Sequence, residues 1–182
     1  MSKLFDIFVK SYTLSPEKDK EFFSYIGYIY CTEELQSMRA YPQHSDANRL
    51  DHIRAVTYMS YVIAKKLSLD VKAASRGAIL HDLVYYDWHD ADFSHRPHGF
   101  RHPAFAAFNA RLLVDDLTKK EERIIRRHMW PLTPLPPSSL EGIVVTFSDK
   151  YCASKEMRVT KKPKAKKKFE DKLTAICNGL NK

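Results

Sequence analysis

The sequence is poor in glycine, with only 5 among its 182 residues. Turn-rich β folds use glycine for the tight connections between strands, so this scarcity favours helices joined by short connections. No apolar stretch approaches the roughly 20 residues that a membrane-spanning helix needs. The first residues also lack the layout of a signal peptide, because Asp6 interrupts the apolar run. We therefore expect a cytoplasmic protein without a membrane span.

Cysteine is scarce as well. Cys31, Cys152 and Cys177 lie far apart, and no two of them form a CxxC pair. An odd number of widely spaced cysteines argues against a disulfide framework. We expect three reduced, partly buried thiols.

The net charge of +8 is confined to one end of the chain. From Lys150 onward there are 11 Lys and Arg against 3 Asp and Glu, and the residues before it are balanced. Most of the chain therefore lacks the basic surface of a nucleic-acid binder. The basic segment 158–168 offers contacts to nucleic acid, anionic lipid or nucleotide phosphates. It has no interleaved aromatic residues for base stacking, so a solvated stretch explains it at least as well.

Apolar residues recur at helical spacing along most of the chain, which predicts a helical bundle. Residues 87–101 follow no period and are expected to form a loop, as are the proline-rich residues 130–137. The predicted helices run from Ser15 to about Met38, from Ser45 or Asp46 to near Leu67, from Val71 (capped by Asp70) to about His81, from Pro103 to Val114, from Thr118 to His128, and from Leu140 (capped by Ser138 or Ser139) to Ser154.

Histidine and aspartate recur in an order that suits metal binding. Zinc, iron and manganese sites draw on neutral imidazole and ionised carboxylate. Each residue alone is more simply explained by a structural role, but Asp149 lies on an otherwise apolar helix, where a buried carboxylate is costly without a partner. The joint pattern therefore predicts a metal site. Its candidate ligands are His52, His81, Asp82, His102, His128 and Asp149.

These residues resemble the signature of the HD superfamily of metal-dependent phosphohydrolases, an all-α family with the order His…His-Asp…Asp. Residues 52–56 (HIRAV) resemble the first motif, residues 78–82 (AILHD) the second and residues 148–151 (SDKY) the last. His102 and His128 match the two extra histidines of the binuclear branch by order and spacing. The resemblance implies a helical HD domain over 45–155, an N-terminal helical extension over 1–44 that packs on it, and a basic segment with a C-terminal helix over 156–182.

The resemblance also implies an activity. His52, His81, Asp82 and Asp149 would hold one divalent ion (Fe, Mn, Mg, Zn, Co or Ni), and Asp82, His102 and His128 a second, with Asp82 as the bridge. Metal-activated water would cleave a phosphate ester, with a nucleotide or similar small molecule as the substrate. Asp82 and Lys150 are the expected catalytic residues, and Lys150, Arg101 and Arg127 the expected phosphate-binding cations. Arg127 equally suits the last turn of a helix, where cations complement the helix dipole.

Two alternatives remain open. The same residue order resembles the di-iron oxygenases built on the HD scaffold, which would need iron and consume O₂. A non-enzymatic protein that binds nucleotides or nucleic acid through the segment 158–168 is the other.

Overall fold

The computed structural model describes residues 3–43, 47–90, 94 and 96–157, and over these residues the protein is an all-α bundle without a strand. A single bridge pairs Pro42 with Asn48. The helices are α1 (Lys3–Lys10), α2 (Lys20–Tyr30), α3 (Glu33–Gln36), the 3₁₀ helix η1 (Ser37–Ala40), α4 (Arg49–Lys66), α5 (Val71–Leu80), α6 (His98–Leu113), α7 (Lys119–Arg127) and α8 (Leu140–Glu156).

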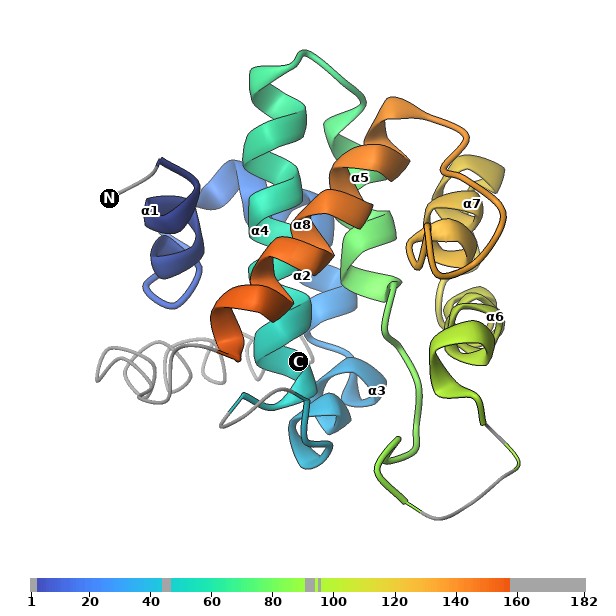
Figure 1. Ribbon diagram of the computed structural model, residues 1–182. Coiled ribbons are helices and arrows are strands. Elements are labelled where there is room, and N and C mark those ends of the chain that lie inside the picture. Colours follow the sequence, from blue (N-terminus) through green and yellow to red (C-terminus); the bar gives the residue numbers. More distant parts are fainter. Residues whose placement is uncertain (1–2, 44–46, 91–93, 95, 158–182) are drawn as a thin grey trace.

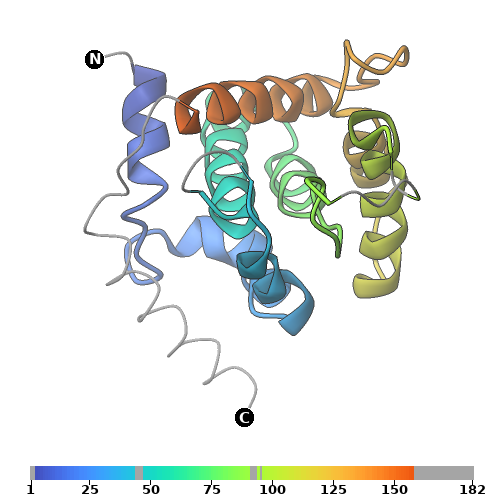
Figure 2. The ribbon, with the colours of Figure 1, turned by 60° about the horizontal axis from the view of Figure 1, so that its bottom comes forward.

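Helices α4 and α5 lie side by side at the centre of the bundle, and α8 packs across both (Figure 1). Helix α7 packs against α5, α6 and α8, and α6 lies beside it on that side of the bundle. On the other side, α1 packs on α4 (Figure 2). No described helix is both long enough and apolar enough to cross a membrane.

The central position of α4 explains its composition. Of its 18 residues, 14 are buried, including charged ones. Each buried charge needs a partner. Arg54 donates from Nε to the carbonyl of Ser11 and from Nη2 to Asp51, and Arg49 donates from Nη1 to the carbonyls of Val84 and Tyr86. These bonds tie the helix to the segments before and after it.

Several predicted caps are confirmed. Asp70 accepts a hydrogen bond from the amide of Ala73 at the start of α5. Thr118 and Glu121 form a capping box at the start of α7, and Ser139 rather than Ser138 caps α8. Asn48, which was not predicted as a cap from the sequence, caps α4. The predicted starts at Ser45 and Asp46 lie outside the described residues.

The prediction of one helix from Ser15 to Met38 is wrong. The carbonyl of Ser15 accepts from the amides of Lys18 and Asp19, and the Asp19 carboxylate accepts from the amide of Ser15, so residues 15–19 form a turn. Helix α2 begins only at Lys20. It ends at Tyr30 because Thr32 is extended and caps a new helix, its hydroxyl accepting from the amide of Leu35.

The predicted helix start at Pro103 is also wrong, and the loop predicted for 87–101 is shorter. Helix α6 begins five residues earlier, at His98, so Pro103 lies within it. Proline removes one helical hydrogen bond there. The first turn gains another, because Nδ1 of His102 donates to the carbonyl of His98.

One expectation about the cysteines is contradicted. Cys31 is disulfide-bonded, although its separation from the other cysteines gave no spacing signal. Cys152 is a buried free thiol, as expected.

The basic segment 158–168 and the C-terminal helix predicted after it lie outside the described residues. The division of the chain at residues 44 and 155 stays a prediction.

A close approach at Gly77 places α7 against α5. A Cβ at this position would lie 2.7 Å from Cγ2 and 3.0 Å from Cβ of Ile124. Ile124 is β-branched and buried, so its side chain has little freedom to move aside. The position of α7, and of His128 at its end, therefore depends on the absence of a side chain at residue 77.

We expect Gly77→Ala to destabilise the protein by about 1–3 kcal/mol, because the added methyl overpacks the contact with Ile124. Gly27→Ala is the matched control, since a Cβ there meets nothing within 4 Å. It should stabilise the protein by about 0.4–1 kcal/mol through the unfolded state. Urea unfolding of both variants measures the difference, and shifts in the same direction would contradict the packing argument.

Candidate metal centre

The six predicted ligand residues lie together, although all except the neighbours His81 and Asp82 are far apart in the sequence. His52 lies in the first turns of α4, His102 on α6 and Asp149 on α8. His81 is the residue that ends α5, and Asp82 follows it; His128 ends α7 in the same way. All six are buried, with Asp149 the most exposed at 9%.

Three of the histidines are oriented by backbone carbonyls. Nδ1 of His81 lies 2.7 Å from the carbonyl oxygen of Ala78, and Nδ1 of His128 lies 2.7 Å from that of Ile125. Both carbonyls belong to the last turn of a helix, where a carbonyl no longer has the usual amide partner four residues later. His102 repeats the contact within α6, at 3.0 Å from the carbonyl oxygen of His98. Since a carbonyl only accepts, Nδ1 carries the proton and Nε2 turns its lone pair into the site.

His52 is oriented by a carboxylate instead. Its Nδ1 lies 2.9 Å from Oε2 of Glu156, and its Nε2 lies 3.2 Å from Oδ1 of Asp149. Burial alone would lower the pKa of His52, but the charge of Glu156 and the hydrogen bond to Asp149 raise that pKa well above its ordinary value. A proton on Nε2 therefore lies between His52 and Asp149 when no metal ion is bound, and coordination would displace it.

Among the other three histidines, Nε2 of His102 also lies 3.2 Å from a carboxylate oxygen, Oδ1 of Asp82, whereas Nε2 of His81 and Nε2 of His128 lie 3.7 and 3.8 Å from the oxygens of Asp82. Nε2 of His81 is buried without a hydrogen-bond partner. Nε2 of His102 lies 2.9 Å from Nε2 of His128. Burial lowers the pKa of His128 to about 3, helped by the neighbouring His102 and His81, and burial also lowers the pKa of His81. The interior therefore holds imidazole lone pairs that a divalent cation would satisfy.

The two carboxylates remain ionised inside the bundle. Burial would raise the pKa of Asp82, but the neighbouring His81, His102 and His128 hold that pKa well below its usual value. Burial would likewise raise the pKa of Asp149. The hydrogen bond from His52 outweighs this effect and lowers the pKa of Asp149 below its usual value. Ionised carboxylates next to neutral imidazoles are the donor set of divalent transition-metal ions.

Asp82 reaches both halves of the cluster. Its Oδ1 lies 3.2 Å from Nε2 of His102 and 3.8 Å from Nε2 of His128. Its Oδ2 lies 3.7 Å from Nε2 of His81 and 3.9 Å from Nε2 of His52. One oxygen thus faces each pair of histidines, which is the geometry that a bridging carboxylate needs.

Two overlapping groups of three residues have ligand atoms within 4.8 Å of one another. The first group is His52, His81 and Asp149. The second is His81, Asp82 and His128. The second group contains His81 where the sequence suggested His102, although His102 itself contacts both His128 and Asp82. The residues present therefore fit one or two divalent ions.

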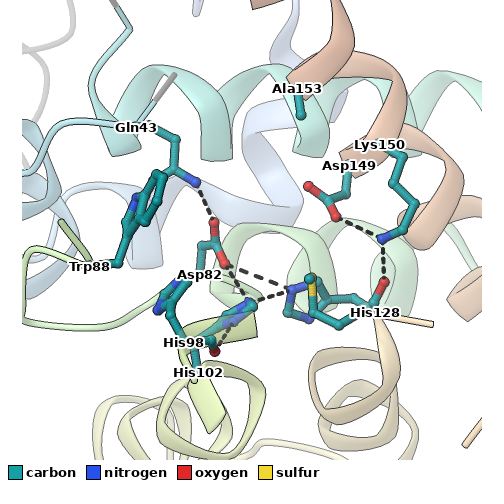
Figure 3. A pocket seen from close by; sticks show the side chains of 10 residues that line it. Gln43, Asp82, Trp88, His98, His102, His128, Asp149, Lys150 and Ala153 are labelled. Carbon is teal, nitrogen blue, oxygen red and sulfur yellow. Dashed lines mark hydrogen bonds and ion pairs between the residues drawn. The ribbon is translucent and has the colours of Figure 1, made fainter. Parts of the chain in front are cut away.

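A cavity of about 260 Å³ opens beside the cluster. Figure 3 shows Asp82 between Gln43 and the two histidines His102 and His128. Lys150 donates from Nζ to Asp149 and to the carbonyl of His128, at 3.3 and 3.0 Å. The cavity thus has a charged end at Lys150, and Trp88 forms part of its opposite wall.

The other two predicted cations do not line this cavity. Arg101 donates to the carbonyl of Arg96 at 3.5 Å, with its guanidinium 5.6 Å from the ring centre of Phe105. Arg127 donates to the carbonyl of Pro136 at 3.1 Å. Of the three predicted phosphate-binding residues, only Lys150 lies at the cavity.

Two residues that contact the ligands were not anticipated from the sequence. Gln43 donates from Nε2 to Oδ2 of Asp82 at 3.0 Å and is itself held by Arg49, whose Nε lies 3.2 Å from Gln43 Oε1. Glu156 binds His52. Glu156 lies seven residues after Asp149, two helical turns along the same face of α8, and that spacing could have identified it. Nothing in the sequence around Gln43 marks it out.

The comparisons with known proteins agree with this geometry. The model of the HD domain family matches residues 49–154. No curated protein matches the chain, and no solved structure does. The match covers more than half of the chain and includes every predicted ligand. This chain therefore belongs to the HD domain family, whose members are helical bundles of the metal-dependent phosphohydrolase superfamily.

Proposed function

We propose that this protein is a metal-dependent phosphohydrolase that cleaves a phosphate ester of a nucleotide or similar small molecule. The observation that carries the proposal is the 2.9 Å contact between Nε2 of His102 and Nε2 of His128, beside Oδ1 of Asp82. Two carbonyl-anchored imidazoles cannot both present lone pairs at this distance without a cation or a proton between them. Membership in the HD family supports the cation and the hydrolytic chemistry.

In this proposal His52, His81, Asp82 and Asp149 hold one ion, and Asp82, His102 and His128 hold a second. Divalent ions bound there would lower the pKa of a water molecule and neutralise charge on a phosphoryl group. The chain's own contribution is orientation. Backbone carbonyls fix three imidazoles, and Gln43 fixes Asp82 by a hydrogen bond to its Oδ2. Such outer contacts hold ligands in place before the ion arrives.

Lys150 is the proposed phosphate-binding residue. Its Nζ lies at the cavity and is held by Asp149 and by the carbonyl of His128, so the charge is placed before a substrate enters. Phosphoryl transfer depends mainly on positioning and on charge stabilisation. Trp88 on the opposite wall, and Met129 elsewhere in the lining, offer apolar surface to the rest of the substrate.

The size of the cavity supports a small substrate. Pockets for small molecules usually enclose roughly 300–1,000 Å³, and this one encloses about 260 Å³. One mononucleotide or sugar phosphate suits such a space, and a nucleic-acid strand does not. The cytoplasmic location predicted from the sequence stays a prediction.

Elemental analysis of the purified protein, followed by assays with and without chelator, tests the proposal. We expect bound divalent metal and hydrolysis of a generic phosphate ester that stops on chelation and resumes on adding Mn²⁺. Two irons per chain with O₂ consumption and no hydrolysis would instead support the oxygenase alternative. A protein without metal affinity would contradict both.

Replacing the proposed bridge should abolish hydrolysis. Outer-shell partners of metal ligands alone are worth about 10–100-fold, so we expect Asp82→Asn to lower kcat/KM by at least about 100-fold and to reduce metal content. Asp115→Asn, at an exposed position between α6 and α7, is the matched control and should leave both unchanged. Equal activity of the two variants would refute the role of Asp82.

Removing the positive charge at the cavity should weaken catalysis and spare the fold. We expect Lys150→Met to lower kcat/KM by about 10²–10³-fold, the usual cost of one electrostatic contact to the reacting group. Lys155→Met is the control, because Lys155 lies over the rings of Phe5 and Tyr151 and does not line the cavity. Steady-state kinetics with the same ester measure kcat/KM for both variants. An equal loss in both would contradict the proposed role of Lys150.

A further inference from the structure

Glu156 is the last residue of α8 and lies just beyond the region 49–154 that matches the family. It is nevertheless 3% exposed, and its Oε2 lies 2.9 Å from Nδ1 of His52. Its partner is one of the proposed metal ligands. The residue therefore contacts the centre from behind, on the side away from the cavity, which it does not line.

The surroundings of Glu156 keep water away from this contact. Phe8 and Tyr12, from α1 and the turn after it, are buried in one cluster with Cys152 of α8. Burial raises the pKa of Tyr12, and the charge of Glu156 raises it further. Burial and Glu156 also raise the pKa of Cys152. The Glu156 carboxylate therefore lies close to both side chains, in an apolar setting that strengthens its hydrogen bond to His52.

Within the described part of the chain, His52 is the one group that forms an ion pair with Glu156. The second carboxylate oxygen, Oε1, is buried without a hydrogen-bond partner. A buried carboxylate satisfied at one oxygen only is costly. Positive charge on His52 offsets that cost, and a metal ion on Nε2 would supply it through the ring.

The other three histidines have no comparable partner. Their Nδ1 atoms donate to the carbonyls of Ala78, His98 and Ile125, which are neutral. A carboxylate behind a ligating histidine raises the basicity of the nitrogen that binds the metal more than a neutral acceptor does. The cluster is therefore asymmetric, with the extra negative charge on the His52 side.

We propose that Glu156 is a positioning residue that makes the His52 position of the centre bind a divalent ion first and more tightly than the His102 and His128 position. The inference rests on the proposed function, because it assumes that both positions bind metal. It assigns a role to a residue outside the family's matched region and predicts an order of loading.

Calorimetric titration of the metal-free full-length protein with Mn²⁺ tests this order. The wild type should show two binding events of different affinity. Glu156→Gln keeps an acceptor for His52 and removes the charge, and we expect it to weaken the tighter event by about 10–100-fold. The weaker event should change little. An unchanged tighter event in Glu156→Gln would overturn the proposal.

Glu141→Gln is the matched control. Glu141 is also buried on α8, but it accepts from the amide of Asp70 at the opposite end of the helix. It should leave both events unchanged. If it weakens the tighter event as much as Glu156→Gln does, the effect reflects the stability of α8 and the proposed role of Glu156 is wrong. Thermal unfolding of the metal-free variants shows whether each is folded.

Two further variants test the order without changing Glu156. We expect the tighter event to persist in His128→Ala and to disappear in His52→Ala. The reverse result would refute the inference even if Glu156→Gln failed to fold. Absence of any Mn²⁺ binding by the wild type would instead refute the proposed function. Two equal events with normal hydrolysis would refute the inference alone.

Discussion

The structure is organised around a buried polar cluster that has more hydrogen-bond acceptors than donors. Four buried imidazoles and two buried carboxylates face one another, and three of the imidazoles have their Nδ1 protons committed to backbone carbonyls. The Nε2 atoms of these three rings carry lone pairs without hydrogens to share, most clearly where Nε2 of His102 and Nε2 of His128 approach to 2.9 Å. Apolar side chains of similar volume would cost less free energy to bury than this polar cluster. The arrangement is explained by what it can bind, because a divalent cation satisfies nitrogen and oxygen donors together.

The bundle holds this cluster with the ends of helices. His81 and His128 both follow the last residue of a helix, where the backbone carbonyl three residues earlier orients the ring. Asp82 follows one of them and turns its two oxygens to different histidines. The crossing of α5 and α7 at Gly77 sets the distance between the two helices that carry these residues. Packing and chemistry are therefore coupled, because a shift of α7 moves a ligand.

Local signals in the sequence predicted much of this arrangement. Asp70, Thr118 and Ser139 mark helix starts through side-chain caps, which act within four residues and can be recognised from the sequence. Ser15 also looked like a helix cap, but its amide donates to the carboxylate of Asp19 and the chain turns there. The sequence alone does not distinguish such a turn from a helix start. Gln43 was not predicted, since its contact with Asp82 spans 39 residues and leaves no local pattern.

The family scaffold and the segments outside its match contribute differently to the centre. The matched region 49–154 contains every proposed ligand. Gln43 and Glu156, which hydrogen-bond to two of those ligands, lie outside it on either side. Segments flanking the match pack on it as well, since Phe8 and Tyr12 share an apolar cluster with Cys152. Because the contacts around a metal ligand change metal affinity or activity by about 10–100-fold, these flanking segments take part in setting the properties of the centre.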